Sequence, residues 1–216
     1  MTCDLKIDWD TVPKLMLVPP ALAGLDRLES TKLRFTMRSD GSSDVTHEYA
    51  NDTPALIKPV YDKFFEWTSN VVNGFFTTWG SKAMRTPIPD VRHITSLTAD
   101  QDSYLFKFES GVPIEVTLSK DYVITRILTK APAQTADEHA EYSPSPQGLL
   151  LTGIDATNKA PDVTTHFIYD LSYQTVDTFE FPQNIHLIVN DNINMKFSLQ
   201  SCAVVRATVI KIKVVP

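Results

Sequence analysis

Hydrophobic residues are densest between Pro54 and Met84, where their spacing predicts one long amphipathic helix. The positions recur every three or four residues and form two adjoining stripes, Val60, Phe64, Trp67, Val71 and Phe75 beside Tyr61, Phe65, Val72, Phe76 and Trp79. Thr53 and Pro54 suit the start of such a helix. Because the combined apolar face is wide, we expect the helix to pack against an equally apolar partner.

Before this helix, the hydrophobic residues form only short patterns. Residues 10–30 are expected to form irregular chain and then a short helix. Leu33, Phe35 and Met37 alternate with polar residues and are followed by turn-forming residues at 39–42. This arrangement predicts a β-hairpin ahead of the long helix.

After residue 90, hydrophobic residues recur at every second position, which is typical of half-buried strands. The predicted strands lie in these stretches: DSYLFKFESG, VPIEVTLSKD, YVITRILTKA, GLLLTGIDA, THFIYDLSYQ, QNIHLIVND and MKFSLQSCAVVRA. Turn signals recur at roughly ten-residue spacing, which favours consecutive antiparallel hairpins over parallel βαβ units. The polar stretch 131–147 interrupts the strands and is expected to be a long loop, either a mobile surface segment or a flap at a cavity mouth.

Together these elements predict an α+β fold in a single domain, residues 1–216. Residues 1–90 supply the short helix, the hairpin and the long aromatic helix, and residues 91–216 supply the sheet. A meander of about eight or nine strands coils, so its concave face must be filled. We therefore expect a strongly curved, half-barrel-like antiparallel sheet wrapped around the amphipathic helix.

Composition narrows the classes of function. The chain has 216 residues, 43% of them hydrophobic, and a formal charge of −6. An acidic chain lacks the basic face that nucleic-acid binding needs. No apolar run approaches the roughly 20 residues of a membrane-spanning helix. The opening residues MTCDLKIDWD show no basic segment followed by an apolar one, so no signal peptide is predicted within this chain.

Cysteine and histidine spacings give no metal or redox motif. Cys3 and Cys202 are too far apart in sequence for a CxxC pair, and either a disulfide between them or two buried thiols fits the pattern. The five histidines are scattered without HExxH or HxH spacing. We therefore predict no metal, no cofactor and no catalytic site.

The aromatic residues supply the remaining hypothesis. Most of the rings should be core, yet an imperfectly packed helix–sheet interface would leave a pocket for an apolar guest or lipid. The candidate ligand-binding residues are Phe64, Trp67, Phe75, Phe76, Trp79, Tyr104 and Phe106. One alternative is a structural or protein-interaction module with a fully packed core and an unknown partner. The other is an enzyme acting on a hydrophobic small molecule, with His93, Tyr104 and Glu115 as nominal candidates.

Two late stretches, SPQGLLLTGIDA and YQTVDTFEFPQNIHLIV, give the chain a resemblance to a known family. The latter has the form of a strand–turn–Pro–strand hairpin, and together they are similar to the LolA/LppX-like superfamily of bacterial lipoprotein carriers. The resemblance covers about the last third of the chain and carries over no functional residue. It implies an unclosed antiparallel barrel capped by helices, a hydrophobic guest and a periplasmic or secreted location, with a cytoplasmic location as the alternative.

Overall fold

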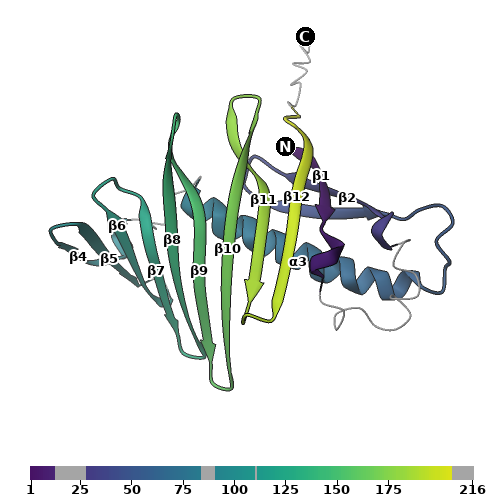
Figure 1. Ribbon diagram of the computed structural model, residues 1–216. Helices are drawn as coiled ribbons and strands as arrows, with labels where there is room; N and C mark the ends of the chain where they lie inside the picture. The colour runs from purple at the N-terminus through teal and green to yellow at the C-terminus, as the bar shows by residue number, and fades with distance from the viewer. Residues whose placement is uncertain (13–27, 84–90, 110, 206–216) are drawn as a thin grey trace, which may run out of the picture.

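The computed structural model describes residues 1–12, 28–83, 91–109 and 111–205, and these form one twelve-stranded antiparallel sheet with a long helix against one face (Figure 1). The two outer strands of the sheet do not pair with each other, so the sheet is open. The predicted antiparallel sheet of open, half-barrel-like shape is confirmed.

The elements follow one another along the chain in the order β1, η1, β2, β3, α3, η3 and then β4 to β12. The early elements are β1 (Thr2–Ile7), the 3-10 turn η1 (Trp9–Thr11), β2 (Lys32–Met37), β3 (Ser43–Glu48), α3 (Lys58–Ala83) and the 3-10 turn η3 (Val91–His93). The remaining strands are β4 (Ile94–Ala99), β5 (Ser103–Glu109), β6 (Pro113–Ser119), β7 (Ile124–Ala131), β8 (Gln134–Ser145), β9 (Gly148–Ala160), β10 (Val163–Val176), β11 (Phe179–Val189) and β12 (Ile193–Ala203).

Strand order explains where the helix lies. Strands that follow one another in sequence are paired, except β3 and β4, and β1 also pairs with β12. This leaves β3 and β4 as the two edges. These are the strands that α3 connects, so the helix must run from one edge towards the other across a face of the sheet (Figure 1). The 26 residues of α3 give a rod of about 39 Å, whereas twelve flat strands would be about 53 Å wide. Curvature of the sheet brings its two edges closer together than this flat width.

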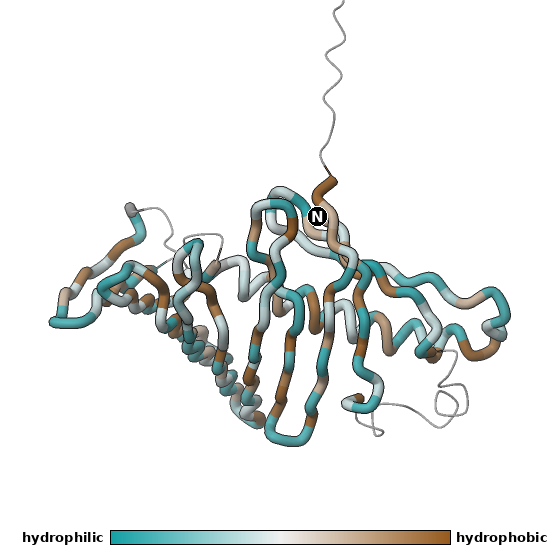
Figure 2. The backbone as a smooth tube through the Cα atoms, turned by 45° about the horizontal axis from the view of Figure 1, so that its top comes forward, coloured by the Kyte–Doolittle hydropathy of each residue, from teal (hydrophilic) through white to brown (hydrophobic). Residues whose placement is uncertain are grey.

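The main core forms between α3 and the face of the sheet that it covers. Apolar and polar residues alternate along the strands (Figure 2), as at Leu33, Phe35 and Met37 of β2, all of which are buried. The Phe76 ring of α3 is fully buried and lies 4.3 Å from the Phe35 ring and 5.6 Å from the Phe181 ring, between ring centroids. Aromatic packing therefore joins the helix to both β2 and β11.

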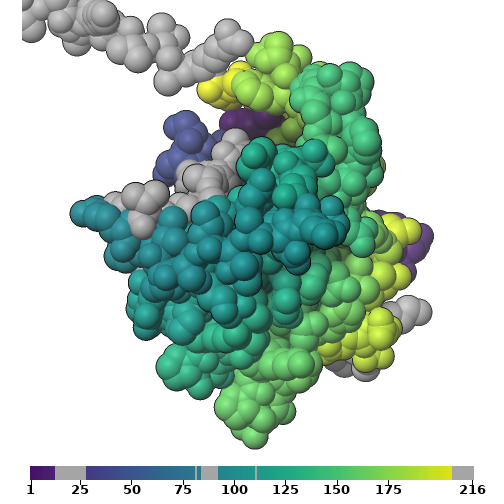
Figure 3. Space-filling model, turned by 90° about the vertical axis from the view of Figure 1, so that its left-hand side faces the viewer, coloured from purple at the N-terminus to yellow at the C-terminus, as the bar shows by residue number. Residues whose placement is uncertain are grey.

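A second, smaller hydrophobic cluster lies on strands β5 to β7. Its buried members are Phe108, Val116, Leu118 and Ile124, with Tyr104 and Phe106 among the partly buried residues packed against them. Viewed from the β4 edge, the strands β4 to β7 form a large part of the near surface (Figure 3). In the described residues this cluster is separate from the core beneath α3.

The long helix is confirmed, but its start differs from the sequence prediction. It begins at Lys58 rather than Pro54. Pro59 has no backbone N–H and is tolerated only in the first turn, so it sets the beginning of the helix. Thr53 does not cap it, and the buried Thr53 hydroxyl has no hydrogen-bond partner among the described residues. The predicted short helix before residue 30 falls largely on residues 13–27, outside the described ranges.

The predicted loop at 131–147 is wrong. Residues 132 and 133 are a tight turn, Ala131 pairs with Gln134, and β8 then runs from Gln134 to Ser145 between β7 and β9. The inward positions of β8 include Ala136, Glu138 and Ala140, which lack the large apolar side chains that mark other strands. Strands β1, β4 and β8, none of which was predicted as a separate strand, raise the number from about nine to twelve.

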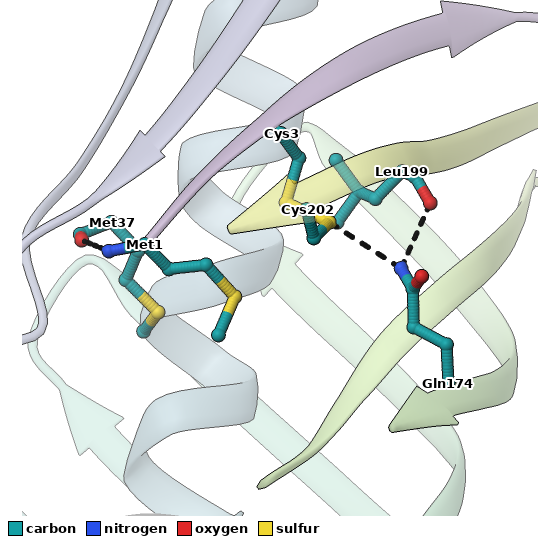
Figure 4. The surroundings of a disulfide bond; sticks show 6 residues. All are labelled: Met1, Cys3, Met37, Gln174, Leu199 and Cys202. Carbon is teal, nitrogen blue, oxygen red and sulfur yellow. Dashed lines mark hydrogen bonds between the residues drawn. A yellow bond between two sulfur atoms is a disulfide. The ribbon is translucent and has the colours of Figure 1, made fainter. Parts of the chain in front are cut away.

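A disulfide between Cys3 and Cys202 joins β1 to β12 (Figure 4). Of the two arrangements that the sequence allowed, the structure therefore has the disulfide. The side-chain amide of Gln174 donates hydrogen bonds to the Leu199 carbonyl, at 2.8 Å, and to the Cys202 sulfur, at 3.4 Å. The bond fastens the beginning of the chain to the last strand, 199 residues later.

Candidate functional site

A cavity of about 660 Å³ opens beside the C-terminal end of α3. We call it the helix-end cavity. Its lining consists of Met1, Met37, Arg38, Ser39, Trp79, Lys82, Ala83, Val123, Tyr142, Gln147, Leu149, Leu150, Leu151, Tyr173, Thr178, Phe179, Glu180, Phe181, Val204 and Val205. These residues come from α3, from the turns β8–β9 and β10–β11, and from the adjoining ends of β1, β2, β7 and β12. The volume falls within the roughly 300–1,000 Å³ typical of small-molecule sites.

The lining is mostly apolar, and part of it faces solvent. Leu149, Phe179 and Val205 are 40%, 57% and 72% exposed, whereas Leu151 and Phe181, also in the lining, are almost fully buried. The turns that carry Leu149 and Phe179 lie at the same end of the sheet in Figure 1 as the N-terminus and the end of β12. The cavity thus has a buried apolar floor and an exposed apolar rim.

The aromatic hydroxyl and indole groups of the wall are bonded to one another or to the backbone. The Trp79 indole N–H donates to the Tyr173 hydroxyl at 3.0 Å, and this hydroxyl donates to the Leu151 carbonyl at 2.6 Å. The Tyr142 hydroxyl donates to the Ile124 carbonyl at 2.8 Å. Because these donors are satisfied within the protein, the three aromatic side chains offer mainly their ring carbons to a guest.

Burial also keeps the phenols of the wall protonated. It is the main cause that raises the pKa of Tyr173 to about 12, with the hydrogen bond from Trp79 acting in the opposite direction. Burial likewise raises the pKa of Tyr142 to about 12, and the Tyr173 side chain adds to this shift. Both side chains are therefore neutral near pH 7, and neither supplies a phenolate for catalysis.

One residue of the lining has a charged side chain that is fully buried and so does not itself face the cavity. The side chain of Lys82, in the last turn of α3, is 0% exposed, and its ammonium group forms an ion pair with Glu138 of β8. Glu138 points towards the helix from one of the inward positions of β8 and remains 26% exposed. A cation is favoured at this end of a helix, where the free carbonyl groups carry partial negative charge.

The seven ligand-binding residues predicted from the sequence are distributed over four places. Trp79 lines the helix-end cavity. Phe75 and Phe76 are 1% and 0% exposed in the core, and Phe64 and Trp67 pack together near the start of α3. Tyr104 and Phe106 belong to the β5–β7 cluster. The structure therefore does not gather the seven around one cavity.

None of the three residues named for an enzyme lines the helix-end cavity. Glu115 lies on the face of β6 opposite the β5–β7 cluster and binds Lys130 at 2.8 Å. This hydrogen bond is the main cause that lowers the Glu115 pKa. His93 ends η3 and is exposed, and Tyr104 stacks on Tyr122.

Sequence reasoning missed most of the cavity wall. One available signal was Leu149–Leu151, because three consecutive leucines break the alternation of a strand that has one buried face. Another was Phe179 directly after a turn, a position usually held by a polar residue. Lys82 gave no signal, since a lysine in the last turn of a helix is ordinary.

A second hollow, of about 510 Å³, lies on the outer face of the sheet over β1 and β10–β12. Outward-facing polar side chains such as Lys6, Asp170, His186 and Lys196 surround it, and His186 pairs with Asp170 at 3.3 Å. It is smaller than the helix-end cavity, and charged side chains stand around it. Within the described ranges, no group of three or more His, Cys, Asp or Glu residues is placed to hold a metal ion. No helix of the described chain is long and apolar enough to cross a bilayer.

Comparisons of the chain with protein-family models, with curated proteins and with solved structures found no match.

Proposed function

We propose that this protein is a non-catalytic binding module for a hydrophobic ligand or lipid, which it holds in the helix-end cavity. The single observation that carries the proposal is the cavity of about 660 Å³ with a buried apolar floor and an exposed apolar rim. Apolar surface of this kind gains free energy when a guest removes it from water, at about 25 cal/mol per Å².

The proposal places the protein in the bacterial cell envelope, periplasmic or secreted. The Cys3–Cys202 disulfide supports this location, because disulfides persist in oxidising compartments and are rare in the cytosol. The resemblance of the late hairpin to the LolA/LppX-like superfamily is the other support, and by analogy it also favours a lipid guest over a soluble metabolite.

The cavity also weighs against the rival hypotheses. A structural or interaction module with a fully packed core has no need of a hollow of this size beside its longest helix. The three residues nominated for an enzyme, His93, Tyr104 and Glu115, all lie outside the hollow. Binding without catalysis is the function that these placements favour.

The proposal is tested with a neutral fluorescent probe, N-phenyl-1-naphthylamine, titrated into the purified protein. Wild type should bind it saturably. An Ala83→Trp variant places an indole in the cavity from the end of α3 and should weaken binding by about tenfold or more. Thr77→Trp, on the exposed side of the same helix, is the matched control and should bind like wild type.

Native mass spectrometry after purification without organic solvent gives an independent measurement. Wild type should carry a co-purified lipid or other apolar molecule, and Ala83→Trp should carry less of it. Absence of probe binding by wild type, or equal binding by wild type and Ala83→Trp, would contradict the proposal.

A further inference from the structure

Strand β4 (Ile94–Ala99) forms one edge of the sheet, at one end of the molecule (Figure 1). Among the residues that the structure describes, no strand pairs with its outer side. Residues 95–99 are all exposed, and Leu97 is 58% exposed. An open edge of this kind presents backbone N–H and C=O groups to which another strand can add.

The hydrogen bonds of the β4–β5 hairpin show which backbone groups of β4 face outwards. Directly opposed residues of an antiparallel pair alternate between hydrogen-bonded and non-hydrogen-bonded positions. The Asp100 N–H donates to the Ser103 carbonyl at 2.9 Å, and the pairing stays regular back to residue 97, so Thr98 is also bonded to β5. Leu97 and Ala99 occupy the alternate positions, and their N–H and C=O groups therefore point away from β5.

The side chains of β4 do not protect this edge. Natural proteins blunt open edges with charged residues, Pro or bulges. The sequence ITSLTA contains neither a charge nor Pro. Its one irregularity lies between Ile94 and Ser96 and leaves the pairing of residues 97–99 regular. The central part of β4 is therefore open to a further strand.

The other edge of the sheet, β3, is better protected. Two of its residues, Asp44 and Glu48, are acidic. Antiparallel pairing of two β3 strands about Thr46 would place Asp44 of one copy opposite Glu48 of the other, and like charges in this position are destabilising. The His47 ring also stacks on Phe65 of α3, with 4.8 Å between ring centroids. Of the two edges, β4 is the one suited to pairing with itself.

We propose that β4 pairs antiparallel with β4 of a second copy of this chain, so that two sheets become one continuous sheet. With the two-fold axis at Thr98, Leu97 of each copy lies opposite Ala99 of the other. Each of these two pairs exchanges two hydrogen bonds through the outward-facing groups. Leu97 lies opposite Phe106 within its own sheet, so the two Leu97 side chains extend the β5–β7 cluster of each copy towards the other.

Charges at the two ends of β4 also suit a second copy. Arg92 and His93 precede the strand, and Asp100 and Asp102 follow it. In the antiparallel arrangement the acidic end of one copy lies beside the basic end of the other, and the two-fold axis repeats this contact. Parallel pairing would bring like ends together, which is unfavourable.

Sedimentation velocity of the full chain, between about 1 and 200 µM, tests the proposal. Wild type should form a dimer whose fraction rises with concentration. Leu97→Pro removes an outward N–H from both copies without removing a β4–β5 hydrogen bond, since Pro is tolerated where the N–H of an edge strand faces solvent. It should weaken dimerisation by about tenfold or more. Val163→Ser, at another exposed apolar residue far from β4, is the control and should dimerise like wild type.

A pair of charge variants separates loss of the interface from loss of folding. Leu97→Lys and Leu97→Glu should each be monomeric, because the two residues at position 97 are diagonal neighbours across the axis, about 7–8 Å apart. An equimolar mixture of the two variants should form a heterodimer again, which unfolded chains would not do.

Three results would overturn the proposal: wild type that stays monomeric over the whole range, a dimer that Leu97→Pro and Leu97→Lys leave intact, or a mixture of the two charge variants that stays monomeric. None of them bears on the proposed function, because no residue of β4 lines the helix-end cavity.

Discussion

Tyr173 shows how a single hydroxyl group organises the wall of the cavity. It accepts a hydrogen bond from the Trp79 indole and donates one to the Leu151 carbonyl, so it links α3 and β9 through a side chain of β10. The three groups are buried or partly buried, where an unpaired donor or acceptor is costly. The Tyr173 hydroxyl therefore stabilises the wall by satisfying two polar groups within an otherwise mostly apolar surface.

We expect Tyr173→Phe to destabilise the protein by about 1–3 kcal/mol, because it leaves the Trp79 N–H and the Leu151 carbonyl without their partner. Urea denaturation followed by tryptophan fluorescence gives the free energy of unfolding. Tyr122→Phe is the control, since Tyr122 is 71% exposed and should change stability by less than about 0.5 kcal/mol. Equal stability of wild type and Tyr173→Phe would show that this bond contributes nothing.

At the scale of elements, α3 is the part of the fold that the sequence predicted best. Its apolar positions span a face too wide to remain in water, so a helix over this stretch had to be buried. Phe75 and Phe76 are indeed fully buried, while Asn73 and Gly74 do not interrupt the helix. The alternation of β2 was equally clear because one of its faces packs on the helix and the other faces solvent.

Strands β1 and β8 were harder to predict for different physical reasons. In β1, Cys3, Leu5 and Ile7 alternate with polar residues, but the strand is only six residues long and its partner β12 is at the other end of the chain. In β8 the inward residues include Glu138, which is charged because Lys82 of the helix lies opposite it. A strand whose inward face carries alanines and one charged residue cannot be recognised from the spacing of large hydrophobic residues alone.

The cavity was hardest to predict, because it depends on where several elements end. Trp79 could be named from the helical pattern, but Tyr173, Leu151 and Phe181 meet it only through the order of strands in the sheet. Phe75 and Phe76 lie within one turn of Trp79 and yet face the sheet, where strand side chains cover them. The number of aromatic residues in the helix therefore predicts an apolar interface, but it does not predict where that interface leaves a cavity.

The packing of α3 against the sheet can be tested at Phe76. Phe76→Ala should destabilise the protein by about 3–5 kcal/mol, since the ring is fully buried among Phe35, Phe181 and Trp79 and its removal leaves a void. The measurement is again urea denaturation. Glu66→Ala, on the exposed side of the helix, should change stability by less than about 0.5 kcal/mol. A cost below about 1 kcal/mol for Phe76→Ala would contradict the packing described here.

For the molecule as a whole, the pairing of β1 with β12 joins the first three strands to the other nine in one sheet. Without this pairing the meander β4–β12 and the unit β1–β3 would be joined mainly through α3. The disulfide lies at this seam, and the Cys3 side chain is almost fully buried there. Because the bond links residues 199 positions apart, it excludes a large number of unfolded conformations.

We expect a Cys3→Ser/Cys202→Ser variant to lose about 2–5 kcal/mol in the free energy of unfolding, as is typical for a disulfide that closes a long loop. Wild type measured in a reducing buffer should show a similar loss, and reductant should not affect the variant further. Unchanged stability of wild type after complete reduction would contradict the stabilising role of this bond.

Because β1 and β12 are paired, a group fused to Met1 would lie close to the helix-end cavity. Met1 contributes to the cavity wall and forms two backbone hydrogen bonds with Met37, and Val204 and Val205 reach the same wall from the end of β12. An affinity tag, a fluorophore or a surface linker fused at Met1 would consequently emerge beside the opening and compete with a guest for space. The turn between Ala160 and Val163 lies at the opposite end of the sheet (Figure 1), so a label inserted there would leave the opening free and turn it away from any support.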